Sequence, residues 1–264
     1  MGRLENILIF KDTEFLCRNN EILENATSRS IAFQKVIKEK QKIKVNKNRY
    51  NEKANVIVSQ KKTFQAAKFY KHSKVAVHNF ASTYSPGGGV ANGAIAQEES
   101  LCQCSNLYFC LNSAEPWEKF YLPHHKKLHN TVYNDDIIYT PNIMVFKTDD
   151  MMPKLMNQED WYTTDVITCA APNLKGIKIT GSQLLFIHEK RLRRILDVAV
   201  LNNIDTIILG AFGCGAFHNN PQIVANAAKN VLTEYMYAFK NIEFAIFCNP
   251  NNDLNYRIFK NTIS

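Results

Sequence analysis

The strongest constraint on the fold is an alternation of short apolar strands with longer helical segments in the second half of the chain. Strands are predicted at residues 165–171, 205–210 and 243–248, and amphipathic helices at 181–203 and 221–239 lie between them. A strand–helix–strand–helix–strand order favours right-handed crossovers, which produce a sheet with helices on both faces. Ligands of such α/β sheets bind at the carboxyl ends of the strands, in the loops that lead into helices.

In the first half of the chain, a helical N-terminal part is followed by further predicted strands and helices. The charged N-terminal part favours one or two helices laid on the outside of the core. A helix with Thr63 as its N-terminal cap is expected at 63–72, and residues 93–111 can form a helix of four or more turns. Further strands are expected at residues 55–59, 74–81 and 137–147.

Length and composition predict one folded unit inside the cell. With 264 residues and 45% hydrophobic content, we expect a single domain over residues 1–264, with residues 1–54 as a helical extension packed on it. No window approaches the ~18 consecutive apolar residues of a membrane span, and the first residues lack a signal-peptide profile. Seven cysteines, an odd number, indicate reduced thiols. The expected location is intracellular, cytoplasmic or nuclear, without membrane attachment.

The net charge of +8 is consistent with an anionic partner, but charge alone does not choose among a phosphate-rich ligand, nucleic acid and an acidic protein. Much of the positive charge lies in the Lys-rich run at residues 35–53. Apart from Tyr50, this run lacks the aromatic side chains on which bases stack, so a solvated helix end followed by an irregular connection is favoured over a nucleic-acid-binding arm.

Two glycine-rich segments lie at strand-to-helix junctions, at residues 79–93 and 209–221. Glycine lets backbone N–H groups approach an anion closely, and the following helix presents its positive end, so the two loops together could hold a diphosphate. Each could also be a simple tight turn. The first loop does not match the G-x-G-x-x-G dinucleotide fingerprint, and neither has the G-K-[ST] ending of a P-loop, which disfavours dehydrogenases and P-loop kinases.

Gln97, Glu98 and Glu99 follow the first glycine loop near the start of the next predicted helix. Successive helical residues point about 100° apart, so the two glutamates cannot perform the same task. One could bind sugar hydroxyls while the other transfers a proton. The alternative is that both are surface charges favoured by the helix dipole.

These motifs resemble a known family. The segment "GGGVANGAIAQEE" is similar to the triple-glycine and Gln-Glu-Glu signature of poly(ADP-ribose) glycohydrolases, and "GAFGCGAFHNNP" resembles their phosphate-binding loop. The order of "NFAS", "PGGG", "QEESL", "ITCAAPN" and "GAFGCGAF" is most similar to the compact microbial branch. The resemblance spans roughly residues 55–250.

The resemblance implies a macrodomain-like mixed sheet flanked by helices, which cleaves the ribose–ribose bonds of poly(ADP-ribose) and releases ADP-ribose without a metal or cofactor. It implies Glu99 as catalytic acid/base and Glu98 as its partner, which positions sugar hydroxyls. The partners implied are poly(ADP-ribose) or ADP-ribosylated proteins, with no requirement for direct nucleic-acid binding. The substrate-binding residues implied are Asn79, Ser82, Gly87, Gly88, Gly89, Val90, Gln97, Ala211, Phe212, Gly213, Cys214, Gly215, Ala216 and Phe217. A non-catalytic ADP-ribose reader and a hydrolase of single ADP-ribose units remain alternatives.

Several features depart from the family pattern or suggest other chemistry. Asn79 and Ser82 take positions where animal members carry Asp and Asn, and His218 and Asn219 stand where relatives often have small residues. Cys214 between glycines could suggest a nucleophile, but a small residue packed against phosphate explains it equally well. The candidates for contact with adenine are Tyr139, Phe247 and Asn249, although a place in the buried aromatic core is favoured for any one of them. A zinc site is disfavoured for Cys102, Cys104, Cys110, His124, His125 and His129, because Cys-x-Cys on a helix points its sulfurs in nearly opposite directions.

Overall fold

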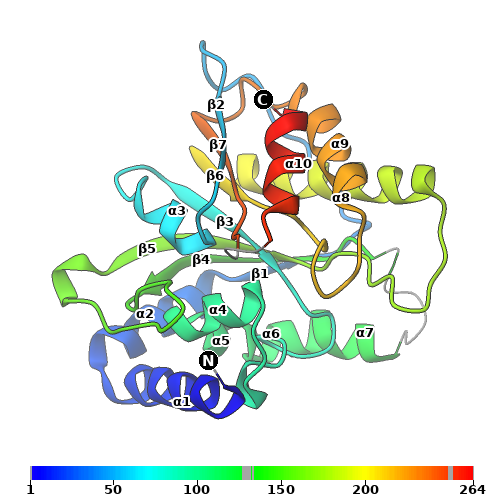
Figure 1. Cartoon of the computed structure of the whole chain (residues 1–264). Helices are drawn as coiled ribbons and strands as arrows, with labels where there is room; N and C mark the ends of the chain where they lie inside the picture. The colour runs from blue at the N-terminus through cyan, green and yellow to red at the C-terminus, as the bar shows by residue number, and fades with distance from the viewer. Residues whose placement is uncertain (1, 127–131, 133, 249–251, 264) are drawn as a thin grey trace.

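The structure, a computed structural model, describes residues 2–126, 132, 134–248 and 252–263. It is built around a seven-stranded mixed sheet with helices on both faces (Figure 1). The strands are β1 (Lys35–Ile37), β2 (Asn55–Ser59), β3 (Val75–Phe80), β4 (Ile137–Val145), β5 (Tyr162–Cys169), β6 (Thr206–Leu209) and β7 (Asn241–Ala245). The predicted α/β class with a mixed sheet is confirmed.

The strand order is β1-β4-β5-β3-β6-β7-β2. The pairs β1/β4 and β4/β5 are antiparallel, whereas β5, β3, β6, β7 and β2 run parallel to one another. The carboxyl ends of these five parallel strands therefore meet at one edge of the sheet, as required for a ligand site there.

Helices cover each face of the sheet. The longer helices are α1 (Arg3–Asn19), α2 (Glu21–Phe33), α4 (Gln97–Cys104), α8 (Gly181–Leu201), α9 (Pro221–Leu232) and α10 (Leu254–Ile263). The shorter ones are α3 (Thr63–Lys68), η1 (Val90–Asn92), α5 (Leu107–Leu111), α6 (Ala114–Pro116), η2 (Trp117–Tyr121), α7 (Leu122–Lys126) and η4 (Gln158–Asp160).

The protein has two apolar cores, one on each face of the sheet, because successive side chains of a strand point to opposite faces. In β6, Ile207 and Leu209 face the core formed with α8, α9 and α10, whereas Ile208 faces the core formed with α3, α4 and α5. The N-terminal helices pack outside the second core, with α1 against α4 and η1, and α2 against β4 and α5. Phe10 of α1 is buried in that core. Of the one or two helices predicted for the N-terminal part, two are present.

The long helix predicted at 93–111 is wrong, because the chain breaks between α4 and α5. Ser105 has extended backbone (φ −149°, ψ 176°), and its Oγ donates to the Leu101 carbonyl oxygen and accepts from the N–H of Leu107. Asn106 Oδ1 accepts from the N–H of Met144 in β4. Hydrogen bonds of Ser105 within the turn and of Asn106 to β4 therefore replace those that would continue the helix.

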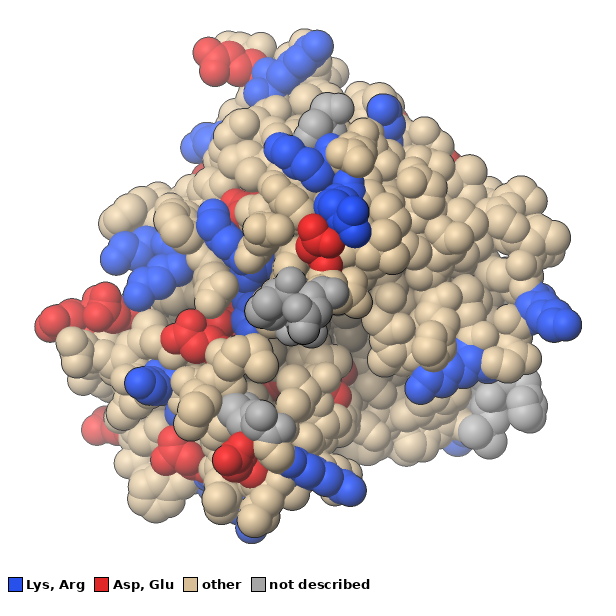
Figure 2. Space-filling model, viewed as in Figure 1, with Lys and Arg blue, Asp and Glu red and all other residues tan. Residues whose placement is uncertain are grey.

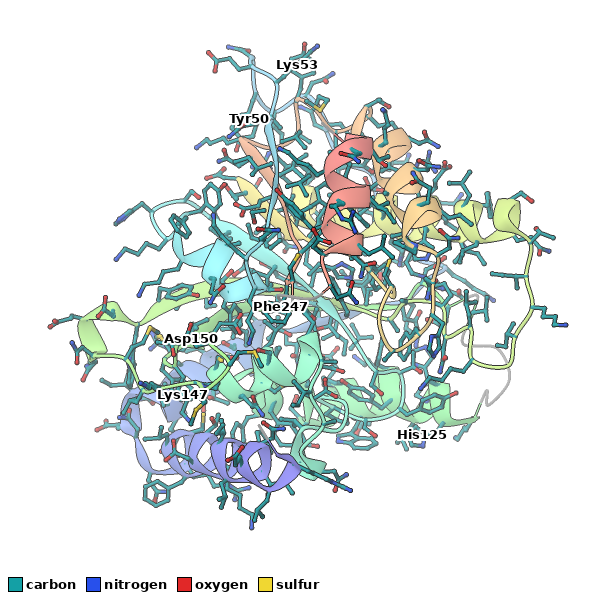
Figure 3. All side chains as sticks on the ribbon, viewed as in Figure 1. Tyr50, Lys53, His125, Lys147, Asp150 and Phe247 are labelled. Carbon is teal, nitrogen blue, oxygen red and sulfur yellow. The ribbon has the colours of Figure 1, made fainter. Side chains whose placement is uncertain are left out.

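Two other local predictions need correction, and a third is confirmed with one irregularity. The cap of α3 is Lys62, and Thr63 is already helical. The strand predicted at 137–147 is confirmed as β4, which ends at Val145 and has a register irregularity at which Asn142 has φ 55°. The Lys-rich run contains β1 rather than a helix end, because pairing with β4 holds its first three residues. In Figure 3 Tyr50 and Lys53, from this run, lie far from Phe247 at the sheet edge.

In the part of the chain that the structure describes, no helix combines the length and the apolar character needed to cross a membrane.

Candidate active site

A large cavity lies at the carboxyl edge of the parallel strands. Its volume is about 890 Å³, and it is lined by segments that follow β2, β3, β5, β6 and β7 and by the first turn of α4. Figure 2 shows the face of the molecule on which the chain is hollowed near its centre. Of the predicted site residues, the lining contains Ser82, Gly88, Gly89, Gln97, Glu98, Glu99, Ala211, Gly213, Gly215, Ala216 and Phe217.

Glu98 is held from behind by the end of β3 and the loop that follows it. Its Oε1 accepts a hydrogen bond from Asn79 Nδ2 at 3.2 Å, and its Oε2 accepts from the N–H of Ser82 at 2.7 Å. The side chain is 3% exposed. Burial raises the pKa of this carboxyl to about 8, although both hydrogen bonds oppose the shift. Burial therefore favours the protonated form of Glu98 near neutral pH.

Glu99 lies on the other side of the first turn of α4, against the triple glycine. Its Oε1 accepts from the N–H of Gly89 at 2.9 Å. Gly88 has φ 60°, and a Cβ added to it would lie 2.5 Å from Glu99 Oε1 and 3.2 Å from Glu98 Oε2. The glycine is thus needed for the carboxylates to lie against the loop, as well as for the left-handed backbone.

Gln97 connects the start of α4 to β3 and α3. Its Oε1 accepts from the N–H of Phe80 at 2.9 Å, and its Nε2 donates to the carbonyl oxygen of His78 at 2.8 Å and to Thr63 Oγ1 at 3.1 Å. Both N–H groups of the amide are therefore used inside the protein. This geometry fixes the position of the two glutamates that follow.

Three predicted substrate-binding residues of the first loop do not line the cavity. Asn79 is fully buried behind Glu98, and Val90 is packed in the core on the α4 side. Gly87 (φ 64°) faces Tyr108 and Cys102, where an added Cβ would come within 2.9 and 3.1 Å. These residues shape the loop from below.

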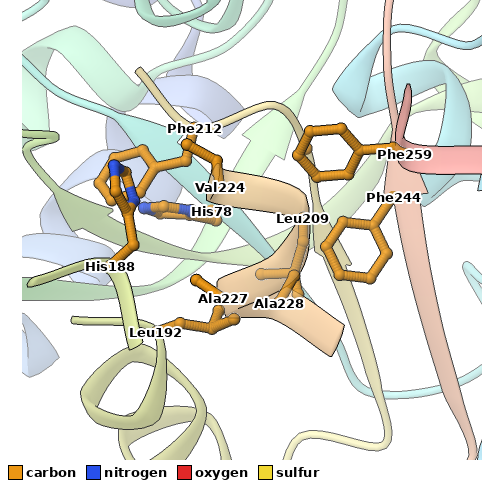
Figure 4. A pocket seen from close by; sticks show the side chains of 11 residues that line it. His78, His188, Leu192, Leu209, Phe212, Val224, Ala227, Ala228, Phe244 and Phe259 are labelled. Atoms are coloured by element: carbon orange, nitrogen blue, oxygen red, sulfur yellow. The ribbon is translucent and has the colours of Figure 1, made fainter. Parts of the chain in front are cut away.

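The second loop presents Ala211, Gly213 and residues 215–217 to the cavity, but neither Phe212 nor Cys214 lines it. The Phe212 ring points away, into a separate small cavity of about 20 Å³ (Figure 4). Burial raises the pKa of the Cys214 thiol to about 12, which keeps it from forming the thiolate that a nucleophile needs.

Phe212 packs between two buried imidazoles. Its ring centroid lies 4.4 Å from that of His78 in β3 and 5.7 Å from that of His188 in α8. Burial lowers the pKa to about 3 for His78 and to about 4 for His188, so both are neutral near pH 7. Figure 4 shows the three rings together.

Asn219 anchors the second loop, and sequence reasoning missed this role. Its Nδ2 lies within 2.8, 3.1 and 3.2 Å of the carbonyl oxygens of Pro172, Gly213 and Phe217. Its Oδ1 lies 2.8 Å from His188 Nε2, which must therefore carry the proton. One buried amide thus joins the loop after β5, both sides of the second loop, and α8.

The structure places two of the three candidates for contact with adenine differently. The Phe247 ring lines the cavity and is 48% exposed. Tyr139 is buried in β4 with its hydroxyl 2.5 Å from Asp165 Oδ2, so it takes the core role favoured for these candidates and does not line the cavity. Asn249 lies outside the described residues.

A polar cluster beside Phe247 was also missed. Lys62 Nζ lies 3.3 Å from Asp149 Oδ1, 3.2 Å from Ser100 Oγ and 5.6 Å from the centroid of the Phe247 ring. Asp149 also accepts from the Ser100 hydroxyl at 2.7 Å and from the N–H of Phe64 at 3.0 Å. No sequence signal connects Lys62 with Asp149, because they come from different loops far apart in the chain.

No group of three or more His, Cys, Asp or Glu side chains is arranged to hold a metal ion within the described ranges. Cys102, Cys104 and Cys110 are buried, His124 is buried apart from them, and His129 is not among the described residues.

Comparisons with known proteins agree with this geometry. The model of the family described as microbial-type PARG, catalytic domain, matches residues 5–148. Among solved structures, poly(ADP-ribose) glycohydrolase (PARG) from Thermomonospora curvata is 24% identical with a TM-score of 0.87, and the match covers 97% of this chain and 98% of that chain. PARG from Deinococcus radiodurans in complex with ADP-ribose is 30% identical with a TM-score of 0.78, over 90% of this chain and 97% of that one. No curated protein matches.

The family match ends before the second loop, whereas the structural likeness extends over both loops and the sheet between them. Because the matched residues 5–148 make up more than half of the 264, the chain belongs to the family of microbial-type PARG catalytic domains.

Proposed function

We propose that this chain hydrolyses the ribose–ribose O-glycosidic bonds of poly(ADP-ribose) and releases ADP-ribose, with Glu99 as general acid and base. The observation that carries the proposal is the Glu98–Glu99 pair, held between the cavity and a glycine loop that contacts both carboxyl groups. Family membership and the likeness to the ADP-ribose complex of the Deinococcus enzyme support it.

The shape of the cavity suits an extended ADP-ribose unit. The Phe247 ring and the aliphatic part of Lys62 offer a surface for adenine at one end. The second loop, with Gly213 and Gly215 free of side chains, and the N–H groups of the first loop would border the diphosphate. The ribose that carries the scissile bond would then lie over Glu98 and Glu99.

Each glutamate has a distinct task in the proposed reaction. Glu99 donates a proton to the leaving oxygen while the bond from the anomeric carbon breaks and the ribose gains oxocarbenium character. A water molecule then attacks the anomeric carbon and gives its proton to Glu99, which restores the acid. Glu98, protonated because burial raises its pKa to about 8, donates a hydrogen bond to a ribose oxygen. Asn79 and Gln97 hold the pair in place.

The test is incubation of the protein with purified poly(ADP-ribose) and measurement of the ADP-ribose released. Wild type should release it, and Glu99→Gln should lower kcat by about 10² to 10⁴-fold while still binding ADP-ribose. Glu21→Gln is a matched control, because Glu21 is an exposed glutamate in the first turn of α2.

Binding of ADP-ribose by wild type without release from the polymer would indicate a reader. Release from singly modified protein, but not from the polymer, would indicate a mono-ADP-ribosyl hydrolase. An active Glu99→Gln would contradict the assignment of the acid.

A further inference from the structure

Three aromatic side chains meet beside the first glycine loop, and the proposed function does not use them. Tyr84 lines the cavity, and its ring lies 5.5 Å from that of His125 in α7. His125 Nε2 also hydrogen-bonds the carbonyl oxygen of Tyr84. The ring of Trp117 lies 6.3 Å from that of His125. Tyr84 and Trp117 are half-buried and His125 is exposed, so this aromatic rim has accessible faces.

The aromatic rim lies at the end of the cavity away from Phe247. Tyr84 is in the segment between Ser82, whose N–H binds Glu98, and Gly89, whose N–H binds Glu99. In Figure 3 His125 is on the opposite side of Phe247 from Asp150, which neighbours the Lys62 cluster. A terminal ADP-ribose placed with adenine at Phe247 and its ribose at the glutamates would therefore direct its leaving group toward Tyr84.

Two segments beside the cavity carry positive charge. Lys126 follows His125, and Lys175 and Lys178 lie in the loop after β5, which also supplies Asn173 to the cavity wall. These three lysines are exposed and form no ion pair with any described residue. In Figure 2 the right-hand side of the visible face shows Lys and Arg with little acidic surface.

We propose that Tyr84, Trp117 and His125 form a binding site for the leaving adenosine, the one whose 2′-hydroxyl departs from the scissile bond. Its base would pack on the rim, and Lys126, Lys175 and Lys178 would attract its diphosphate. This inference rests on the proposed function, because only a polymer offers an adenosine in that place. Base–aromatic packing is tolerant of the identity of the base and contributes substantially to affinity in other nucleotide sites.

The consequence is a preference for chains over isolated units. In a polymer the leaving group is a nucleotide that the rim can hold, whereas in a single unit attached to protein it is an amino-acid side chain. The rim should therefore contribute to turnover of chains of two or more units, and not to the affinity for free ADP-ribose, which ends at the glutamates.

The experiment compares two substrates for His125→Ala and Trp117→Ala, neither of which changes a cavity-lining residue. The first is poly(ADP-ribose), and the second is an ADP-ribose nitrophenyl glycoside, in which a small aryl group replaces the next nucleotide. We expect kcat/KM on the polymer to fall about 5- to 20-fold, with the glycoside and the Kd for ADP-ribose unchanged. Phe186→Ala, which alters an exposed aromatic residue of α8, is the matched control.

Thermal unfolding verifies that each variant is folded. If Trp117→Ala does not fold, His125→Ala alone provides the test. Equal losses on both substrates, or no loss on either, would overturn the rim as a nucleotide site. Lys175→Glu combined with Lys178→Glu should raise KM for the polymer and weaken its dependence on salt. If wild type itself releases nothing from the polymer, the proposed function fails rather than the rim.

Discussion

The two glycine-rich loops look alike in sequence but are held by different parts of the molecule. In the first, Gly87 and Gly88 both have positive φ, and side chains of α4 and α5 fill the space beside them. In the second, Gly213 is the one glycine with positive φ, and Gly215 has nothing within 4 Å of an added Cβ. The first loop is therefore fitted to the carboxyl groups, whereas Asn219 holds the second from behind. We expect the first to govern chemistry and the second to govern binding.

The largest effect is expected for Gly88→Ala. The new Cβ would meet Glu99 Oε1 at 2.5 Å at a backbone φ of 60°, so the carboxyl group, the loop or both must move. A displacement of about 1 Å at a reacting group costs about 10²-fold in rate, and we expect at least that loss in kcat on poly(ADP-ribose). The Kd for ADP-ribose, measured by calorimetry, should change much less.

The control for this change is Gly215→Ala in the second loop, where the added methyl group meets open space. It should keep kcat near that of wild type. Equal losses of kcat in the two variants would show that any side chain in either loop blocks the substrate, and the distinction between the loops would fail.

The next effect tests the second loop through Asn219→Ala. The variant removes the buried donor shared by three carbonyl oxygens and the acceptor of His188. Leaving such groups unpaired costs about 1–3 kcal/mol each, and we expect the free energy of unfolding to fall by about 3 kcal/mol. The loosened loop should weaken ADP-ribose binding by roughly 10-fold, with a smaller change in kcat.

Asn226→Ala, on the exposed side of α9, is the matched control and should be close to neutral. If Asn219→Ala lost kcat while keeping its Kd, the second loop would act on the reaction itself, contrary to the division proposed above.

The division between the loops shows where sequence reasoning succeeded and where it could not. The predicted order of strands and helices placed both loops at the correct edge of the sheet, because the hydrophobic periodicity of the local sequence identifies these elements. The need for glycine at position 88 can be explained only once the Glu99 carboxyl group is known to lie against it. The role of Asn219 required bringing α8 next to the second loop.

Elements defined by long-range pairing were missed for the same reason. β1 has three residues in a polar run and exists because β4 pairs with it. The break between α4 and α5 depends on Asn106 binding Met144 in another strand. Local propensity cannot report either contact.

The next expected effect is smaller and concerns the pH dependence of stability. Glu98, beside the first loop, and His188, behind the second, should change the free energy of unfolding in opposite directions as pH rises. Burial raises the pKa of Glu98 from 4.5 to about 8 and lowers that of His188 from 6.5 to about 4. Between pH 4.5 and about 8, Glu98 holds a proton in the native state that it has lost in the unfolded chain. The contribution of Glu98 to the free energy of unfolding therefore falls as pH rises through this range. For His188 the unfolded chain holds the extra proton, so its contribution falls as pH decreases below 6.5.

Urea unfolding of wild type, Glu98→Gln and His188→Gln across pH 4–9 measures both contributions. The stability of wild type relative to Glu98→Gln should fall as pH rises toward 8, by at most about 1.4 kcal/mol per pH unit. Relative to His188→Gln it should fall as pH drops from 6.5 toward 4. Parallel curves for wild type and either variant would show that the group in question is not buried as the structure describes.

The smallest effect is expected for Cys214→Ala, although Cys214 is the residue of the second loop with the most reactive functional group. Its thiol does not line the cavity, and burial raises its pKa to about 12. We expect kcat and the Kd for ADP-ribose to stay within about two-fold of wild type, since neither a thiolate nor a cavity contact is lost. Cys248→Ala, a half-buried cysteine outside both loops, is the matched control. A tenfold loss of kcat for Cys214→Ala alone would place reactive chemistry in the second loop, and the assignment of catalysis to the first loop would have to be abandoned.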